Sequence, residues 1–356
     1  VILGPKNVAL AARLEGEIKS LTEKKQAAVD CKSSAEIGER IKRLEAELAK
    51  AKSEPLTLPL RVGKRGDGTA DVSIGDQTQT LAEGAWSDWY EMTFELTRLV
   101  KIHAITRVKL VALDDPHFEL YVNALEIDPA RPPFWQPISQ PASFSKELVE
   151  AADRRFEAVG WSCMTHPFKD KIVDAITFME DIEFTMKWRE DLTYAMLARN
   201  DWRLFVSLFS ESDRLQHMMY QYYDQGHPLY DAEKAAQRMT FFGEEITLGD
   251  AIPALYRQID RIVGRVQSEF LRPEDMLLVG ADHGFQSFRR QVHVNNWLAE
   301  HGYLVPLPNT TSSKAQVVTG YVDWSKTKAY SMGIGFVYLN LKGREPQGIV
   351  DPSEAE

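Results

Sequence analysis

Apolar side chains near the start of the chain recur at the spacing of an α-helix. They fall into two groups, Leu10, Leu14, Ile18 and Leu21, then Ile37, Ile41, Leu44 and Leu48. Lys and Glu dominate the other positions, so each group forms one narrow apolar stripe. Ser33 and Glu36 have the spacing of a capping box, which marks the start of the second helix. The pattern predicts an antiparallel helical hairpin over about residues 8–52, which packs on its own domain or contacts a partner protein.

Beyond Pro55 the apolar positions alternate with polar ones, which is the period of a half-buried strand. The alternating positions are Leu56, Leu58, Leu60, Tyr90, Met92, Phe94, Leu96, Ala104, Val108 and Leu110. Glycine-rich turns such as Gly66-Asp67-Gly68 separate the runs. We therefore predict a small antiparallel β module over about residues 55–127. Together with the hairpin it forms a predicted module of residues 1–127.

A proline-rich segment marks a predicted boundary after this module. It runs from Asp128 to Pro133 and includes consecutive prolines, which lack backbone donors and stop both sheet and helix. The segment predicts a linker over residues 128–135 that few contacts cross. We expect residues 1–127 to fold as a unit of their own.

Residues 136–356 show a third pattern. Helix-like stretches lie near residues 145–158, 170–199 and 250–271. They alternate with two continuous apolar runs, Leu204–Phe209 and Met276–Gly280. Continuous apolar strands that alternate with helices indicate a mainly parallel sheet covered on both faces. The predicted fold class is therefore α/β, with ligands bound beyond the carboxyl ends of the strands.

Composition narrows the classes of function. The chain has 52 acidic and 42 basic residues, and its net charge of -10 would repel a nucleic acid polymer. With only Cys31 and Cys163, it has neither a disulfide framework nor a cysteine-based zinc site. No apolar run approaches the ~18 residues of a membrane span. The chain opens at Val1 without an initiator Met, as if inside a longer protein. This beginning leaves room for a targeting segment upstream and leaves the compartment undetermined, with the periplasm or the cell exterior favoured.

Both predicted strands end in Asp and His. Asp213 and His217 stand four residues apart, so they project from one side of a helix's first turn. Asp282 and His283 follow the second strand where the backbone leaves the pleat, and there adjacent side chains can reach one ion. Carboxylate and neutral imidazole are ligands that suit Zn²⁺, Mn²⁺ or Fe. Two such pairs at neighbouring strand ends predict two divalent metal ions.

Each pair also has a plainer interpretation. An Asp and a His four apart occur often by chance, and a buried His more often belongs to a hydrogen-bonded core. The Asp282-His283-Gly284 run is more specific, because Gly allows a tight turn and a buried Asp-His pair needs partners. The occurrence of both pairs at two strand ends favours metal binding over a structural role.

The segments Ser212–His217 and Gly280–Phe285 resemble two metal motifs of the type I phosphodiesterase and nucleotide pyrophosphatase family, within the alkaline phosphatase superfamily. The resemblance covers roughly residues 136–345. Shorter segments also resemble bacterial, uncharacterised members: Trp86–Trp89, Phe288–Arg290, Asn295–Leu298 and Val322–Ser325. The resemblance implies an alkaline-phosphatase-like core, into which the module of residues 1–127 is inserted as a lid.

Carried over by motif, the resemblance implies that Asp213 and His217 bind one zinc ion and that Asp282 and His283 bind the other. The family pattern also needs an Asp after the first strand, a Thr or Ser nucleophile and a late His, and none has a match here. We expect the first two upstream of Val1 and the last beyond Glu356. The chain is therefore expected to be a fragment that is inactive alone.

The implied activity is metal-dependent hydrolysis of a small phosphate ester, which is a phosphodiester, a pyrophosphate or a phosphomonoester. Two metal ions would stabilise the attacking and leaving oxygens of an in-line displacement, with a Thr or Ser alkoxide as the nucleophile. Arg289 and Arg290 are candidates for binding a phosphate oxygen, although an exposed Arg is more often solvated or ion-paired. The alternative is a non-catalytic binding protein on a degenerate hydrolase scaffold. Metal content distinguishes the two.

Overall fold

The structure, a computed structural model, describes residues 2–6, 8–27, 31–53, 55–97, 100–114, 118–152, 156–157, 165–308, 320–333 and 335–355. Cys163, Val1 and Glu356, named above, lie outside these residues. The chain divides into two compact units, Val1–Ser287 and Phe288–Glu356. Among the helices of the described residues, none combines the length and the apolar character that a membrane crossing requires.

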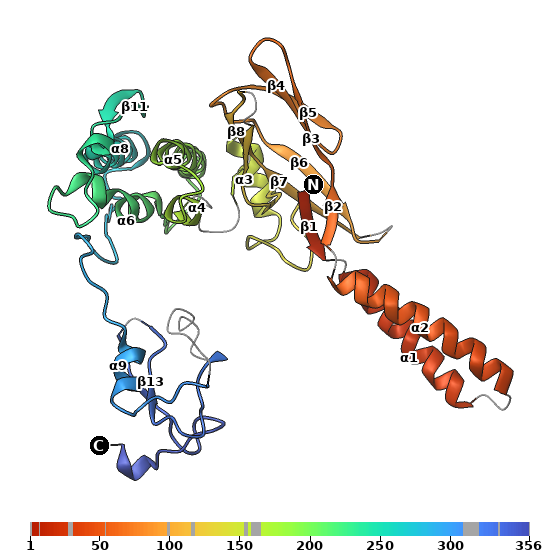
Figure 1. The fold of residues 1–356 in the computed structure, drawn as a ribbon. Coiled ribbons are helices and arrows are strands. Elements are labelled where there is room, and N and C mark those ends of the chain that lie inside the picture. The colour runs from red at the N-terminus through yellow and green to blue at the C-terminus, as the bar shows by residue number, and fades with distance from the viewer. Residues whose placement is uncertain are drawn as a thin grey trace. The chain divides into compact units, whose positions relative to one another are not determined.

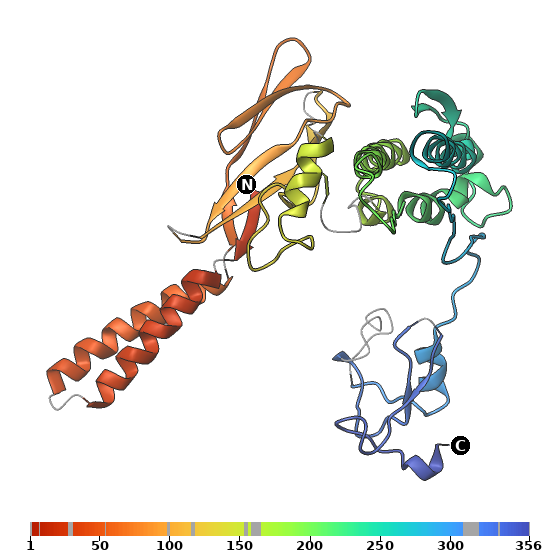
Figure 2. The same cartoon turned by 180° about the vertical axis from the view of Figure 1, so that it is seen from behind.

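The predicted helical hairpin is confirmed. Helices α1 (Val8–Ala27) and α2 (Cys31–Ser53) lie side by side in both views (Figure 1, Figure 2). Leu14 is buried between them and contacts Leu44 and Leu48, so the apolar stripes face each other. At the open end of the hairpin, strand β1 (Ile2–Lys6) pairs antiparallel with β2 (Pro55–Leu58) and joins the two helices to the β module.

The predicted β module is also present as antiparallel sheets. One sheet contains β3 (Leu60–Lys64), β4 (Thr69–Ile74) and β5 (Gln77–Ala82); a second contains β6 (Tyr90–Glu95), β7 (Lys101–Thr106) and β10 (Glu126–Ile127); and β8 (Val108–Ala112) pairs with β9 (Glu119–Val122). Alternate residues of β4 are buried, namely Ala70, Val72 and Ile74. They pack in one core with Met92 and Phe94 of β6, as the period of two requires.

The rest of the first unit is mostly helical. Its elements are α3 (Phe144–Ala152), α4 (Thr165–Lys169), α5 (Ala175–Leu197), α6 (Glu211–Tyr223), α7 (Ala232–Ala235), strands β11 (Arg238–Phe241) and β12 (Glu244–Thr247), the 3-10 turn η1 (Leu248–Asp250), α8 (Ala251–Arg265) and the π-helical turn η2 (Val266–Phe270). Asp174 caps α5 by accepting a hydrogen bond from the Thr177 amide at 2.8 Å. Phe178 of α5, Leu215 of α6 and Leu255 of α8 lie in one buried cluster, which therefore holds the three longest helices of this region together.

The predicted α/β fold with a mainly parallel, alkaline-phosphatase-like sheet is wrong. Every strand pair among the described residues is antiparallel, in sheets of two or three strands, and the one parallel contact is an isolated bridge between Leu341 and Val350. The apolar runs 204–209 and 276–280 form no strand. Their aliphatic side chains are 68% to 85% exposed at Leu204, Val206, Leu208, Met276, Leu278 and Val279. An apolar run becomes a buried strand only where neighbouring strands pair its backbone groups, and no described segment does so here.

The second unit is small. It contains α9 (Val294–Glu300), the strand pair β13 (Ala329–Tyr330) and β14 (Tyr338–Leu339), and the 3-10 turn η5 (Pro352–Glu354). Its buried cluster is Leu298, Leu304, Tyr321, Val322 and Ala329. The buried Asn340 amide lies within 3.1 Å of the carbonyl oxygens of Trp324, Thr327 and Gln347, so it ties three loops together.

The predicted linker, residues 128–135, lies within the first compact unit. Arg131 binds the carboxylates of Asp128 and Glu91, each at 2.8 Å, so this segment is fastened to β6. The division between compact units falls instead at Ser287. Independent folding of residues 1–127 stays a prediction.

Candidate metal centre

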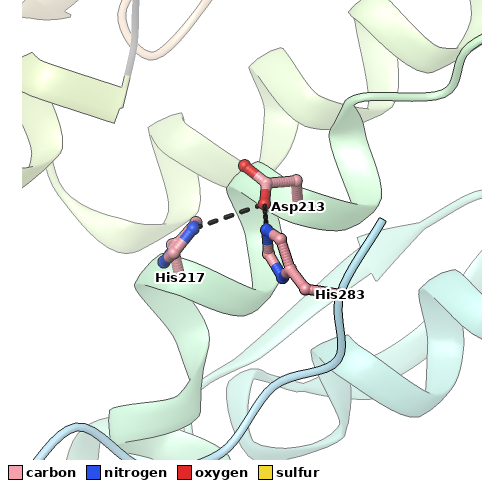
Figure 3. Close-up of side chains that lie close together, drawn as sticks. All are labelled: Asp213, His217 and His283. Atoms are coloured by element: carbon pink, nitrogen blue, oxygen red, sulfur yellow. Dashed lines mark ion pairs between the residues drawn. The ribbon is translucent and has the colours of Figure 1, made fainter. Parts of the chain in front are cut away.

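Three of the four predicted metal ligands lie together on the first unit. Asp213 and His217 project from the same side of α6, with 3.3 Å between Asp213 Oδ1 and His217 Nε2. His283 reaches the same carboxylate oxygen from another segment, with its Nε2 at 3.5 Å. Figure 3 shows both imidazoles beside the Asp213 carboxylate. One ligand atom from each of the three residues lies within 4.8 Å of the others, and we call this group the metal cluster.

Contacts with α6 position His283. The segment that carries it, residues 283–287, has no regular secondary structure and is held by contacts farther along the same helix. Tyr220 donates its hydroxyl to the Phe285 carbonyl at 3.1 Å, and Ser287 donates its hydroxyl to Asp224. The Phe285 ring packs edge-on against His217, with 4.8 Å between the ring centroids. The cluster therefore depends on a helix and a loop that is fastened along it.

The helix is in turn fixed by its buried face. Leu215 and Met219 of α6 are fully buried, whereas His217 between them is exposed. Glu211, at the start of the helix, is also fully buried and pairs with Arg189 of α5 at 3.1 Å. This amphipathic pattern leaves the Asp213 and His217 side of the helix facing solvent.

A hydrogen bond sets the tautomer of His283. Its Nδ1 lies 3.1 Å from the Gly284 carbonyl oxygen, which can only accept, so Nδ1 carries the proton. In the neutral ring, Nε2 is then an unprotonated acceptor and faces Asp213. Two acceptors 3.5 Å apart repel each other unless a cation or a proton lies between them. Metal-binding histidines commonly have this arrangement, in which the second ring nitrogen donates to a carbonyl.

The donor set fits a catalytic type of zinc site. Zinc bonds of 2.0–2.2 Å in a tetrahedron place neighbouring ligand atoms about 3.4 Å apart. The two distances to Asp213 Oδ1 are 3.3 and 3.5 Å, and all three ligand atoms lie within 4.8 Å of one another. One carboxylate and two imidazoles would give three protein ligands and leave a fourth position for water or substrate. The side chains of His217 and His283 are 51% and 49% exposed, so the cluster is open to solvent.

Asp282, the fourth predicted ligand, lies next to His283. Its side chain is 90% exposed, and its Oδ2 lies 3.7 Å from His283 Nε2, at the edge of the metal cluster. Among the described residues, the metal cluster is the one group of three or more acidic, His or Cys side chains close enough to share an ion. The implied division into two pairs, each with its own ion, therefore stays a prediction.

The remaining candidates are Arg289, Arg290 and Thr165. Arg289 and Arg290 belong to the second unit, Phe288–Glu356, and their role in phosphate binding stays a prediction. Thr165, a residue of the type expected for the nucleophile, begins the short helix α4, and its hydroxyl accepts a hydrogen bond from Arg214 Nε at 3.1 Å. That hydroxyl is engaged in the packing of α6.

A separate cavity of about 380 Å³ lies beside α5. Apolar side chains of α3, α5 and the following segment form much of its wall, including Leu148, Trp188, Leu192 and Phe205. None of the metal cluster residues lines this cavity. The side chains of the cluster, and not a cavity, are therefore what identifies it as a candidate site.

Sequence reasoning did not identify the residues that position the cluster. Tyr220 follows Asp213 by seven residues, which places it on the same side of α6, and this spacing was a usable signal. Phe285 and Ser287 gave none, because their partners became apparent only from the path of the loop.

A scan against protein-family models, a search of curated proteins and a search of solved structures each returned no match for this chain.

Proposed function

We propose that Asp213, His217 and His283 bind a divalent metal ion, zinc or manganese, with which the protein hydrolyses a small phosphate ester. The observation that carries the proposal is the approach of three ligand atoms within 4.8 Å of one another on a solvent-exposed surface. The tautomer that the Gly284 carbonyl imposes on His283 supports it. The substrate class comes from the resemblance of Ser212–His217 and Gly280–Phe285 to phosphodiesterase motifs.

The bound ion and the residues that hold it have different roles in the proposed reaction. The ion supplies Lewis-acid stabilisation of the charge that develops on the phosphoryl oxygens. Asp213 neutralises part of the ion's charge, while the two imidazoles leave it a net cation that attracts a phosphate. Overall, the oxygen of a water molecule becomes bonded to phosphorus and the bond to the leaving oxygen breaks. The proton that the water loses ends on the leaving oxygen, which departs as an alcohol or a phosphate. A second ion beside Asp282 would stabilise the leaving oxygen in the same way.

The test is turnover of a chromogenic phosphodiester, bis(p-nitrophenyl) phosphate, with zinc or manganese added. It uses the full product of the gene, with and without a chelator. We expect hydrolysis by the full product, loss with a chelator and loss in His283→Ala. His166→Ala is the matched control, because His166 is an exposed histidine on α4 outside the metal cluster. Turnover that persists in both variants and in chelator would refute the proposal. Neither turnover nor metal binding would favour the non-catalytic binding protein.

A further inference from the structure

A buried charge network links the β module to the helix that carries the metal cluster. Its centre is Asp181 of α5, which is fully buried. Asp181 Oδ1 accepts from Arg107 at 2.9 Å, and Oδ2 accepts from Arg214 at 3.1 Å. Arg107 lies between β7 and β8, whereas Arg214 lies on α6 next to Asp213. The two oxygens of the Asp181 carboxylate are thus bound by one arginine of the β module and one arginine of α6.

Arg214 fixes how α6 is rotated about its axis. It is fully buried, and each of its three guanidinium nitrogens has a partner. Nε donates to Thr165 at 3.1 Å and Nη1 to Thr185 at 3.4 Å, while Nη2 donates to Asp181. Because Asp213 is the preceding residue, any rotation of Arg214 about the helix axis also moves the Asp213 carboxylate relative to His283.

Arg107, which binds the other oxygen of Asp181, is equally constrained. Its guanidinium carbon lies 3.4 Å from the Phe184 ring centroid, 4.7 Å from that of Trp86 and 5.2 Å from that of Trp89. Its side chain is 3% exposed, so its charge is compensated by these rings and by buried carboxylates and not by water. The position of Arg107 therefore limits the orientations that Asp181 can adopt.

We propose that Asp181 is a positioning residue of the metal centre, through which Arg107 of the β module sets the affinity of the metal cluster for its ion. This inference rests on the proposed metal site. Without Arg107, Oδ1 of Asp181 is free, so the carboxylate turns toward Arg214 and α6 shifts with it. The Asp213 and His217 ligand atoms then lose their alignment with His283.

Electrostatics alone predicts the opposite sign. Removing a buried positive charge strengthens the binding of a cation, whereas loss of positioning weakens it. The β module also offers a matched control. Lys109 on β8 pairs with Glu180 of α5 at 2.6 Å and binds the Thr177 hydroxyl at 2.9 Å, but it does not contact Asp181. Replacing Lys109 therefore removes one charge and one module contact, as replacing Arg107 does, and leaves Asp181 and Arg214 in place.

The experiment measures the zinc Kd of the chain by competition with a chromogenic chelator in Arg107→Met and Lys109→Met, with the melting temperature of each variant. Met fits the aromatic surroundings of Arg107, and Asp181 keeps Arg214, so we expect Arg107→Met to fold. Both variants should lose thermal stability. Only Arg107→Met should weaken zinc binding, by about 10-fold, the lower end of the effect of removing outer partners of a metal site.

Two results would overturn the inference. Equal Kd values in the two variants, or tighter zinc binding in Arg107→Met, would show that Asp181 transmits no positioning, while the metal site itself stands. No zinc binding by the unsubstituted chain would remove the proposed metal site, and this inference with it.

Discussion

Helix α6 carries two neighbouring charged residues in opposite environments. Arg214 is fully buried, and all its guanidinium nitrogens are bound by partners on α4 and α5. Asp213 faces two half-exposed imidazoles, each of which directs its Nε2 at the carboxylate. The first arrangement is complete in itself and holds the helix in place. The second is open to solvent and gathers three possible metal ligands, which is why we assign the chemistry to it. A charged residue indicates a function through its surroundings and not through its charge alone.

The largest expected effect on the free energy of unfolding comes from the buried partners of Arg214. Asp181→Ala leaves Arg107 and Arg214 buried without their shared carboxylate, so the free energy of unfolding should fall by about 3–5 kcal/mol. Asp213→Ala removes the same type of side chain from the exposed side and should change it by less than about 1 kcal/mol. Urea denaturation of both variants tests this contrast, and similar losses in the two would erase it.

The pH dependence of stability tests the buried charge network around Asp181. Burial, with the Asp181 carboxylate nearby, raises the pKa of Glu157 from 4.5 to about 8. The folded state therefore holds a proton that the unfolded state releases. The stability from this group is complete below 4.5 and is lost as pH rises through about 8. The loss should total a few kcal/mol, at no more than about 1.4 kcal/mol for each pH unit.

Glu157→Gln removes this titration. Urea unfolding across the window from 4.5 to about 8 should show a shallower fall in stability for the variant than for the unsubstituted chain. Identical slopes would mean that Glu157 does not carry the dependence.

On the exposed side, the ion should act as a stabilising ligand. Zinc at roughly 100 times its Kd should raise the free energy of unfolding by about 2.7 kcal/mol, because it binds the folded chain alone. His283→Ala should abolish that gain and leave the stability without metal nearly unchanged. An equal gain in the variant would place the ion elsewhere.

The smallest effect should come from the contact that fastens the His283 segment. Tyr220→Phe removes the hydrogen bond to the Phe285 carbonyl and keeps the ring, which costs about 1 kcal/mol and weakens zinc binding about fivefold. Tyr223→Phe is the control, because Tyr223 lies on the same helix and is 47% exposed. Zinc titration of both variants measures the difference, and unchanged affinity in Tyr220→Phe would mean that the loop needs no such anchor.

Local patterns predicted what local interactions determine. The spacing of Leu14, Leu44 and Leu48 predicted a hairpin, because each stripe needs only the other helix. The spacing of Asp213 and His217 predicted two side chains on one side of a helix. The expected meeting of His283 with these residues is observed, but the reason given for it was wrong, since anchored loop contacts and not a parallel sheet bring them together.

The predictions that failed concerned features whose partners lie far away in the sequence. The run Leu204–Phe209 has the composition of a buried strand, yet a strand requires neighbours that the run itself does not specify. The partners of Asp181 are equally remote in sequence, because Arg107 and Arg214 lie on other elements. No periodicity within α5 reveals which buried carboxylate will be shared by two arginines.

The central claim is that Asp213, His217 and His283 form one metal site, and calorimetric titration of the chain with Zn²⁺ tests it most directly. The account predicts saturable binding that survives in His166→Ala and is lost in His283→Ala, with circular dichroism spectra of both variants unchanged. Binding of equal affinity and stoichiometry in all three proteins, or no binding in the unsubstituted chain, would contradict it.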